Sequence, residues 1–120
     1  MSKMHTPIAV FDSGLGGLTV MKQIMDEFPD ENIVYFGDTG RVPYGSRSKE
    51  TIVKYSMSDV RFLESHDVKM IIIACGTASS VALDCVRQNS NIPIVGVVDA
   101  TSNAAVEATK NKKVGIIGTN

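Results

Sequence analysis

The chain of 120 residues is long enough for one domain with a single core, and 43% hydrophobic and 21% charged residues are ordinary for a soluble globular protein. A formal net charge of -1, without a block of like charges, gives no reason to expect nucleic acid or a membrane as a partner. Two cysteines ten residues apart match neither a disulfide framework nor a zinc site. No signal peptide or transmembrane span is visible, so we expect a cytoplasmic protein.

Apolar segments of strand length alternate with helical patterns along the whole chain. The expected strands are 8–11, 33–36, 70–74, 94–98 and 114–117, and the expected helices are about 18–28, 49–65, 79–88 and 102–110. Strands separated by single helices imply right-handed crossovers and a parallel sheet that is covered on both faces. The sequence therefore predicts an α/β fold, a doubly wound parallel sheet of the flavodoxin-like kind, whose ligands bind at the carboxyl ends of the strands.

A glycine-rich turn follows the first strand. The dinucleotide-binding pattern would need glycine at position 19, where Thr19 stands, and a P-loop would need a lysine after Gly17. A tight turn with positive φ and close packing of the next helix explains these glycines better. Asp12 and Ser13 place a carboxylate and a hydroxyl at the strand end, although Ser13 would equally serve as a helix cap.

The connection after the second strand, residues 37–48, is long for its position, which favours a functional role. Its turn Pro43-Tyr44-Gly45 is suited to present backbone N–H groups and the Tyr44 phenol to a small ligand. The alternative is a surface loop with Tyr44 as its packing anchor. Two arginines of this loop are candidate carboxylate ligands, with solvated surface charge as the alternative: Arg41 and Arg47.

Cys75 ends the third strand, just before a helix. A helix N-terminus favours the thiolate form of a cysteine, so Cys75 is a candidate for acid/base or nucleophilic chemistry. The alternative is a small apolar residue at the end of a buried strand. The hydroxyls of Thr77 and Ser79, with the free N–H groups of the helix, predict a seat for a carboxylate. Cys85 falls on the apolar face of the same helix, where we expect it to pack in the core.

Three motifs, taken together and in order, closely resemble glutamate racemases: IAVFDSGLGGLTV at 8–20, GDTGRVPYG at 37–45 and ACGTAS at 74–79. The closing segment 114–119 is similar to the strand that opens the second lobe of that family. The resemblance implies the first half of a two-lobe, pseudo-symmetric racemase. Residues 1–98 would form the first α/β lobe, and residues 99–120 would form a crossover helix and the first strand of a second lobe that is otherwise missing.

The resemblance also implies an activity. Glutamate racemases interconvert L- and D-glutamate for peptidoglycan synthesis with two thiols and without pyridoxal phosphate or metal, so no cofactor is expected. Cys75 would be one of the two thiols, and Asp12 would assist it by tuning the thiol or the substrate ammonium group. The residues that would hold the substrate are Asp12, Ser13, Pro43, Tyr44, Gly45, Gly76 and Thr77.

Two departures from the family pattern limit this expectation. Gly76 stands where glutamate racemases usually carry asparagine, and the second thiol is absent from the chain. We therefore expect that the 120 residues alone do not racemise glutamate at a useful rate. A related racemase for another acidic substrate and a non-catalytic α/β binding module are the alternatives. An exposed fifth strand would favour association, for instance as a homodimer.

Overall fold

The computed structural model describes residues 5–118, so residues 1–4, Thr119 and Asn120 of the expected lobes lie outside the described part. Four parallel strands form one sheet in the order β2-β1-β3-β4. The strands are β1 (Ile8–Asp12), β2 (Ile33–Gly37), β3 (Met70–Ile73) and β4 (Ile94–Gly96). The α-helices are α1 (Leu18–Glu27), α2 (Lys49–Glu64), α3 (Gly76–Gln88) and α4 (Val97–Ala108), and a short 3-10 helix covers Thr39–Arg41.

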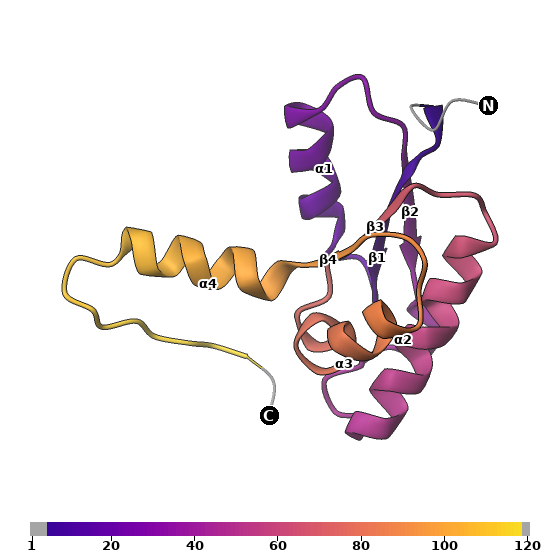
Figure 1. Cartoon of the computed structure of the whole chain (residues 1–120). Coiled ribbons are helices and arrows are strands. Elements are labelled where there is room, and N and C mark those ends of the chain that lie inside the picture. The colour runs from indigo at the N-terminus through magenta and orange to yellow at the C-terminus, as the bar shows by residue number, and fades with distance from the viewer. Residues whose placement is uncertain (1–4, 119–120) are drawn as a thin grey trace.

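Helices cover the sheet on both sides. In Figure 1, α1 lies on one side of the sheet and α2 on the other, with α3 packed beside α2. The two central strands are β1 and β3, and Val10, Phe11, Ile71 and Ile73 are fully buried in them. Strand β1 is buried on both faces and β3 alternates between half-buried and buried residues. Strands covered on both faces need continuous apolar runs, which is why these segments are apolar rather than alternating with polar residues. The predicted doubly wound α/β fold is confirmed.

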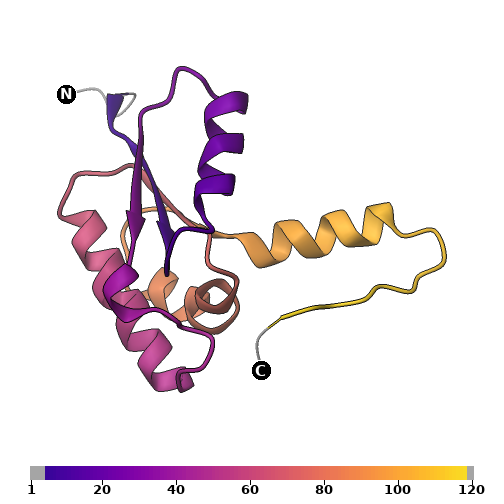
Figure 2. The same cartoon turned by 180° about the vertical axis from the view of Figure 1, so that it is seen from behind.

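The fourth helix leaves the body of the molecule. Figures 1 and 2 show α4 projecting from the sheet, with the chain after it turning back alongside the helix. The strand predicted at 114–117 is wrong as a paired strand, because this segment joins no described strand. Ile116 and Ile117 are 92% and 102% exposed. An apolar, β-branched sequence alone does not make a strand when no neighbouring strand accepts its hydrogen bonds.

Two helix starts differ from the prediction. Helix α3 begins at Gly76, three residues early, because the Cys75 sulfur accepts a hydrogen bond from the Ala78 N–H and caps the helix. Strand β4 ends at Gly96, so Val97 and Val98 belong to α4 and not to the sheet. The last pair between β3 and β4 joins Ile73 to Gly96, and β3 ends there, which leaves Val97 without a strand partner.

None of the helices in the described part of the chain is long and apolar enough to cross a membrane.

Candidate functional site

The strand order reverses between β1 and β3, and the candidate site lies at this point. From β1 the chain steps to β2 on one side, and the later strands add on the other side. The Ala74 N–H donates to the Phe11 carbonyl at 2.7 Å, which keeps the carboxyl ends of the two strands together. Asp12 and Cys75 therefore leave the sheet at the same place. In open α/β sheets, ligands bind at such a switch point.

Cys75 lies between the end of β3 and the first turn of α3. Its thiol is 3.5 Å from the Ser13 hydroxyl oxygen, to which it donates, and its sulfur accepts from the Ala78 N–H at 3.4 Å. Cys75 is 6% exposed. Ser13 faces the thiol and caps no helix, because α1 begins after Gly17 without a side-chain cap.

The Asp12 carboxylate organises the turn after β1. One oxygen, Oδ2, accepts from the N–H groups of Gly14 at 3.2 Å and Gly17 at 3.0 Å. The Tyr35 hydroxyl lies 3.4 Å from the same oxygen and donates to the Gly14 carbonyl at 2.7 Å. Burial, followed by the charge of Asp12, raises the pKa of Tyr35 to about 12, so this phenol stays a donor. Tyr35 is absent from the predicted site. In the parallel register of β1 and β2, Tyr35 pairs with Val10, two residues before Asp12. Pairing the two predicted strands in this register could have placed Tyr35 near Asp12.

Close packing explains the glycine at the start of α1. A Cβ on Gly17 would lie 2.7 Å from the Asp12 Cβ and 3.0 Å from the Ala74 Cβ. The predicted close approach of this helix is confirmed. The predicted positive φ is wrong, because no described glycine has one.

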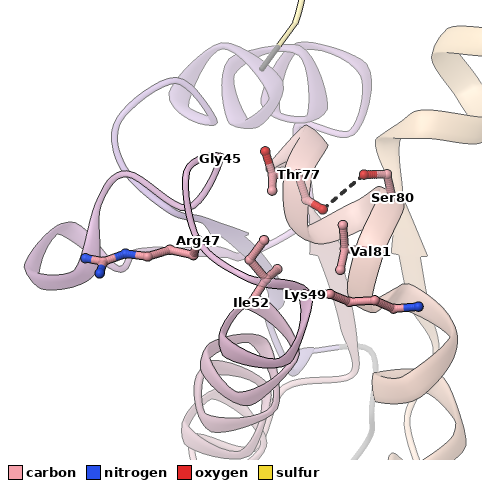
Figure 3. A pocket seen from close by; sticks show the side chains of 7 residues that line it. All are labelled: Gly45, Arg47, Lys49, Ile52, Thr77, Ser80 and Val81. Atoms are coloured by element: carbon pink, nitrogen blue, oxygen red, sulfur yellow. Dashed lines mark hydrogen bonds between the residues drawn. The ribbon is translucent and has the colours of Figure 1, made fainter. Parts of the chain in front are cut away.

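A pocket of about 370 Å³ opens between the start of α2 and the start of α3, and its lining includes Thr77, two residues after Cys75, but not Cys75 itself. Gly45 and Thr77 both line this pocket (Figure 3). In Figure 3 the side chain of Arg47 extends away from Thr77, and the side chain of Lys49 extends in the opposite direction. The remaining lining residues are Ile52, Ser80 and Val81.

Two side chains of α3, those of Ser79 and Cys85, do not have the predicted surroundings. Ser79 is buried and its hydroxyl accepts from the Val98 N–H at 3.4 Å, so its predicted part in a carboxylate seat is wrong. Cys85 is half-buried and lies outside the core cluster, so its predicted core packing is also wrong. Gly76 is exposed, and a Cβ there would meet nothing within 4 Å.

The prediction that the Tyr44 phenol faces a ligand is wrong. Tyr44 is 1% exposed, and its ring packs against Phe11 and Tyr55 with centroid separations of 6.4 and 5.6 Å. It is the packing anchor of the loop, which was the alternative. Its neighbours along the chain keep their backbone near the surface, with Pro43 exposed and Gly45 partly exposed.

A buried polar network, the Tyr44 cluster, surrounds this phenol and consists of Asp38, Arg41, Tyr44 and Asp59. The hydroxyl of Tyr44 contacts the carboxylates of Asp38 and Asp59. Arg41 pairs with the same two carboxylates at 2.8 and 2.9 Å, and its guanidinium lies 4.4 Å from the Tyr55 ring centroid. Arg41 is therefore occupied within the fold and is not a free ligand for a carboxylate.

Sequence reasoning overlooked Asp59. Its position follows Ile52 and Ser56 on the buried face of α2, where Val60 and Leu63 continue the apolar series. A carboxylate on such a face is rarely buried without a partner, so Asp59 itself was the available signal for a polar network.

The described residues include no group of three or more His, Cys, Asp or Glu side chains that could hold a metal ion.

Comparison with known proteins connects this geometry to one family. The family model described as Asp/Glu/Hydantoin racemase matches residues 15–120. A glutamate racemase of Chlorobium phaeobacteroides is 53% identical over 116 residues, which is 96% of this chain and 43% of the relative. A glutamate racemase of Neisseria meningitidis is 53% identical over 115 residues, with 95% and 43% covered.

Solved structures give the same result. Glutamate racemase from Aquifex pyrophilus superposes with a TM-score of 0.92 at 46% identity over 95% of this chain and 45% of that protein. The enzyme from Francisella tularensis in complex with D-glutamate superposes with a TM-score of 0.80 at 45% identity, over 84% of this chain and 39% of that protein. The chain thus spans less than half the length of these relatives. The resemblance predicted from the sequence is confirmed, and the chain belongs to the Asp/Glu/Hydantoin racemase family.

Proposed function

We propose that the chain carries one half of a glutamate racemase site, with Cys75 as one of its two catalytic thiols. The observation that supports this most is the thiol at the α3 N-terminus, which touches the Ser13 hydroxyl at the point where the strand order reverses. The relatives named glutamate racemase and the Francisella tularensis structure with D-glutamate support glutamate as the substrate.

The proposed chemistry is proton abstraction from Cα. The thiolate of Cys75 takes the α-proton: the C–H bond breaks, an S–H bond forms, and the electron pair passes into the substrate carboxylate. A second thiol on the opposite face then gives a proton to Cα, which inverts its configuration. The N–H of Ala78 and the α3 dipole stabilise the thiolate before it reacts. Because the α-proton is weakly acidic, donors around the carboxylate and exclusion of water carry much of the catalysis.

The other residues have supporting roles in this proposal. Asp12, fixed by two backbone N–H groups, tunes the thiol or holds the substrate ammonium group. The hydroxyl of Ser13 and the backbone around Thr77 contact the amino acid. From the β2–α2 loop, the exposed Pro43 and the partly exposed Gly45 take part, and Tyr44 contributes only main-chain atoms because its phenol is buried.

The second thiol must come from outside these residues. Cys85 lies ten residues after Cys75 on the same helix, which at 1.5 Å per residue separates them by about 15 Å. Two thiols on opposite faces of one Cα atom have to be much closer. We therefore propose that residues 1–98 form the first lobe, that 99–120 lead into a second one, and that the isolated chain does not racemise glutamate.

The cellular setting belongs to the same proposal. D-glutamate would be supplied in the cytoplasm for peptidoglycan synthesis, and the free state of both cysteines suits a reducing compartment. The exposed segment 114–117 supports association, for instance as a homodimer.

The first experiment incubates the chain separately with L- and D-glutamate in deuterated water and follows the Cα proton by NMR. We expect slow exchange of one enantiomer, without inversion, because a single thiol can remove and return a proton on one face only. The Cys75→Ser variant should lose this exchange. The Cys85→Ser variant is the matched control and should keep it.

Three outcomes would contradict the proposal. Exchange of both enantiomers with inversion would mean that the chain holds a complete two-base site. Exchange that survives Cys75→Ser would assign the base to another residue. Absence of exchange from a chain shown to be folded by circular dichroism would leave it without half-site chemistry.

A racemase for another acidic substrate is the second candidate, and Gly76 is the observation that keeps it. Gly76 has no side chain and therefore lacks the amide that glutamate racemases usually present there, and the space beside it is open. The same exchange experiment with aspartate separates the two candidates, since faster exchange of aspartate than of glutamate would favour the second.

A further inference from the structure

The Tyr44 cluster needs one more proton than a phenol can supply. The Tyr44 hydroxyl lies within hydrogen-bonding distance of two carboxylates, those of Asp38 and Asp59, but it can donate to only one of them. The other contact is a hydrogen bond only when that carboxyl group is itself protonated. Burial, together with the neighbouring Asp38 carboxylate, raises the pKa of Asp59 to about 7. Asp59 is therefore the group that holds the additional proton.

The charges in the cluster also favour one protonated carboxyl group, because a single guanidinium, that of Arg41, pairs with both Asp38 and Asp59. With Asp59 protonated, the Arg41 guanidinium balances the Asp38 carboxylate 2.8 Å away, and the cluster is neutral. With Asp59 ionised, two buried carboxylates share one guanidinium and one phenol proton. The titratable groups in contact with the cluster are its own members and Tyr55 of α2, while β1 contributes the apolar ring of Phe11.

This cluster anchors one wall of the candidate site. Gly45 follows Tyr44 directly and lines the same pocket as Thr77 (Figure 3). The Tyr44 carbonyl also accepts a hydrogen bond from the Arg47 N–H at 3.0 Å, which closes the turn around Gly45. The position of Gly45 is therefore linked to the position of the Tyr44 ring through the backbone of this turn.

We propose that Asp59 is a positioning residue for the ligand site: it fixes the ring of Tyr44 and thereby holds Gly45 in the wall of the pocket that Thr77 also lines. The inference rests on the proposed function for the ligand, glutamate, but the order of the loop can be measured without any ligand. Asp59 touches no substrate in this arrangement and acts only through Tyr44.

The proposal predicts a pH dependence with a defined sign. The pKa of Asp59 in the fold, about 7, lies above its ordinary value of 3.8. The stabilisation from its proton is complete below the lower value and is lost as the pH rises through the higher one. The loop should therefore be more ordered at pH 6 than at pH 8.

Amide hydrogen exchange of the Arg47 N–H tests this directly. In the unmodified chain we expect its protection factor to fall at least tenfold between pH 6 and pH 8. Asp59→Asn should keep the protection at both values, because the amide oxygen can accept from Arg41 and the NH₂ group can donate to the Tyr44 oxygen. Asp59→Ala should be weakly protected at both. Asp26→Asn, which removes an exposed carboxylate on α1, is the matched control.

The outcomes separate the two levels of inference. Equal protection of the unmodified chain at both pH values, or an Asp59→Asn loop as loose as that of Asp59→Ala, would overturn the positioning role. If Asp59→Ala does not fold, the protection of the Arg47 N–H in Asp59→Asn, compared with the unmodified chain at both pH values, decides whether Asp59 has the positioning role.

A titration with D-glutamate, followed by NMR, completes the test. Binding should weaken at least tenfold from pH 6 to pH 8 in the unmodified chain, and stay constant in Asp59→Asn. The expected protection pattern without glutamate binding at either pH would contradict the proposed function and leave the loop anchor standing. Binding that is unaffected by Asp59→Ala would overturn the link between Asp59 and the site.

Discussion

The turns after β1 and β3 end neighbouring parallel strands and both contain glycine, yet they are packed in opposite ways. A Cβ on Gly17, after β1, would come within 3.0 Å of two side chains, whereas a Cβ on Gly76, after β3, would meet nothing within 4 Å. The first turn is a rigid frame around the Asp12 carboxylate. The second is an open edge beside the Cys75 thiol. The tightly packed turn therefore follows β1, and the turn with open space around it follows β3.

The largest expected effect is a difference in the free energy of unfolding between an Asp12 variant and a Cys75 variant. Asp12→Ala removes the buried charged acceptor of the Gly14 and Gly17 N–H groups, which should lower the free energy of unfolding by about 3 kcal/mol or more. Cys75→Ala loses only weak sulfur contacts and should cost less than about 1.5 kcal/mol. Urea unfolding of both variants measures this. Equal losses would mean that the β1 turn is not the frame.

A smaller effect is expected from filling the tight turn. Gly17→Ala forces a shift of Asp12, Ala74 or the Tyr35 hydroxyl and should cost about 1–3 kcal/mol, the usual range for overpacking. Its unfolding midpoint in urea is the measurement. A variant as stable as the unmodified chain would show that α1 can move away from the strand ends without cost.

The smallest effect on stability should come from the open turn. Gly76→Ala should leave the free energy of unfolding unchanged or raise it by up to about 1 kcal/mol, because the first helical residue has an ordinary φ and no neighbour to displace. Gly76→Asn should fold equally well and bind D-glutamate about fivefold or more tightly, which corresponds to about 1 kcal/mol. Unfolding curves and NMR titrations would check both variants. A destabilised Gly76→Ala would contradict the open edge.

The sheet and two of the helices could be predicted from local patterns alone. The continuous apolar runs of β1 and β3 and the spacing of apolar residues in α2 are strong signals, because most of these side chains are buried or half-buried. Helix α1 was predicted at the correct position although none of its residues is fully buried. Residues 114–117 carry a similar apolar signal and form no paired strand. Strand formation depends on a partner, and a local pattern does not contain the partner.

The site was predictable where a strand end fixes the residue, and uncertain elsewhere. Asp12, Ser13 and Cys75 follow from strand ends, and the structure brings Ser13 to the Cys75 thiol. The orientation of Tyr44 depends on Asp59, fifteen residues later on another element, so the loop sequence alone could not decide between a buried and an exposed phenol.

The unpaired segment 114–117 also affects how copies of the chain meet one another. Apolar extended segments are templates for cross-chain pairing, and charged residues beside them oppose it. Three exposed lysines, Lys110, Lys112 and Lys113, stand just before this segment. Their repulsion acts over about 10 Å at 0.1 M salt and over about 3 Å at 1 M. Solutions of this chain should therefore stay clear at low ionic strength and turn turbid as salt is added.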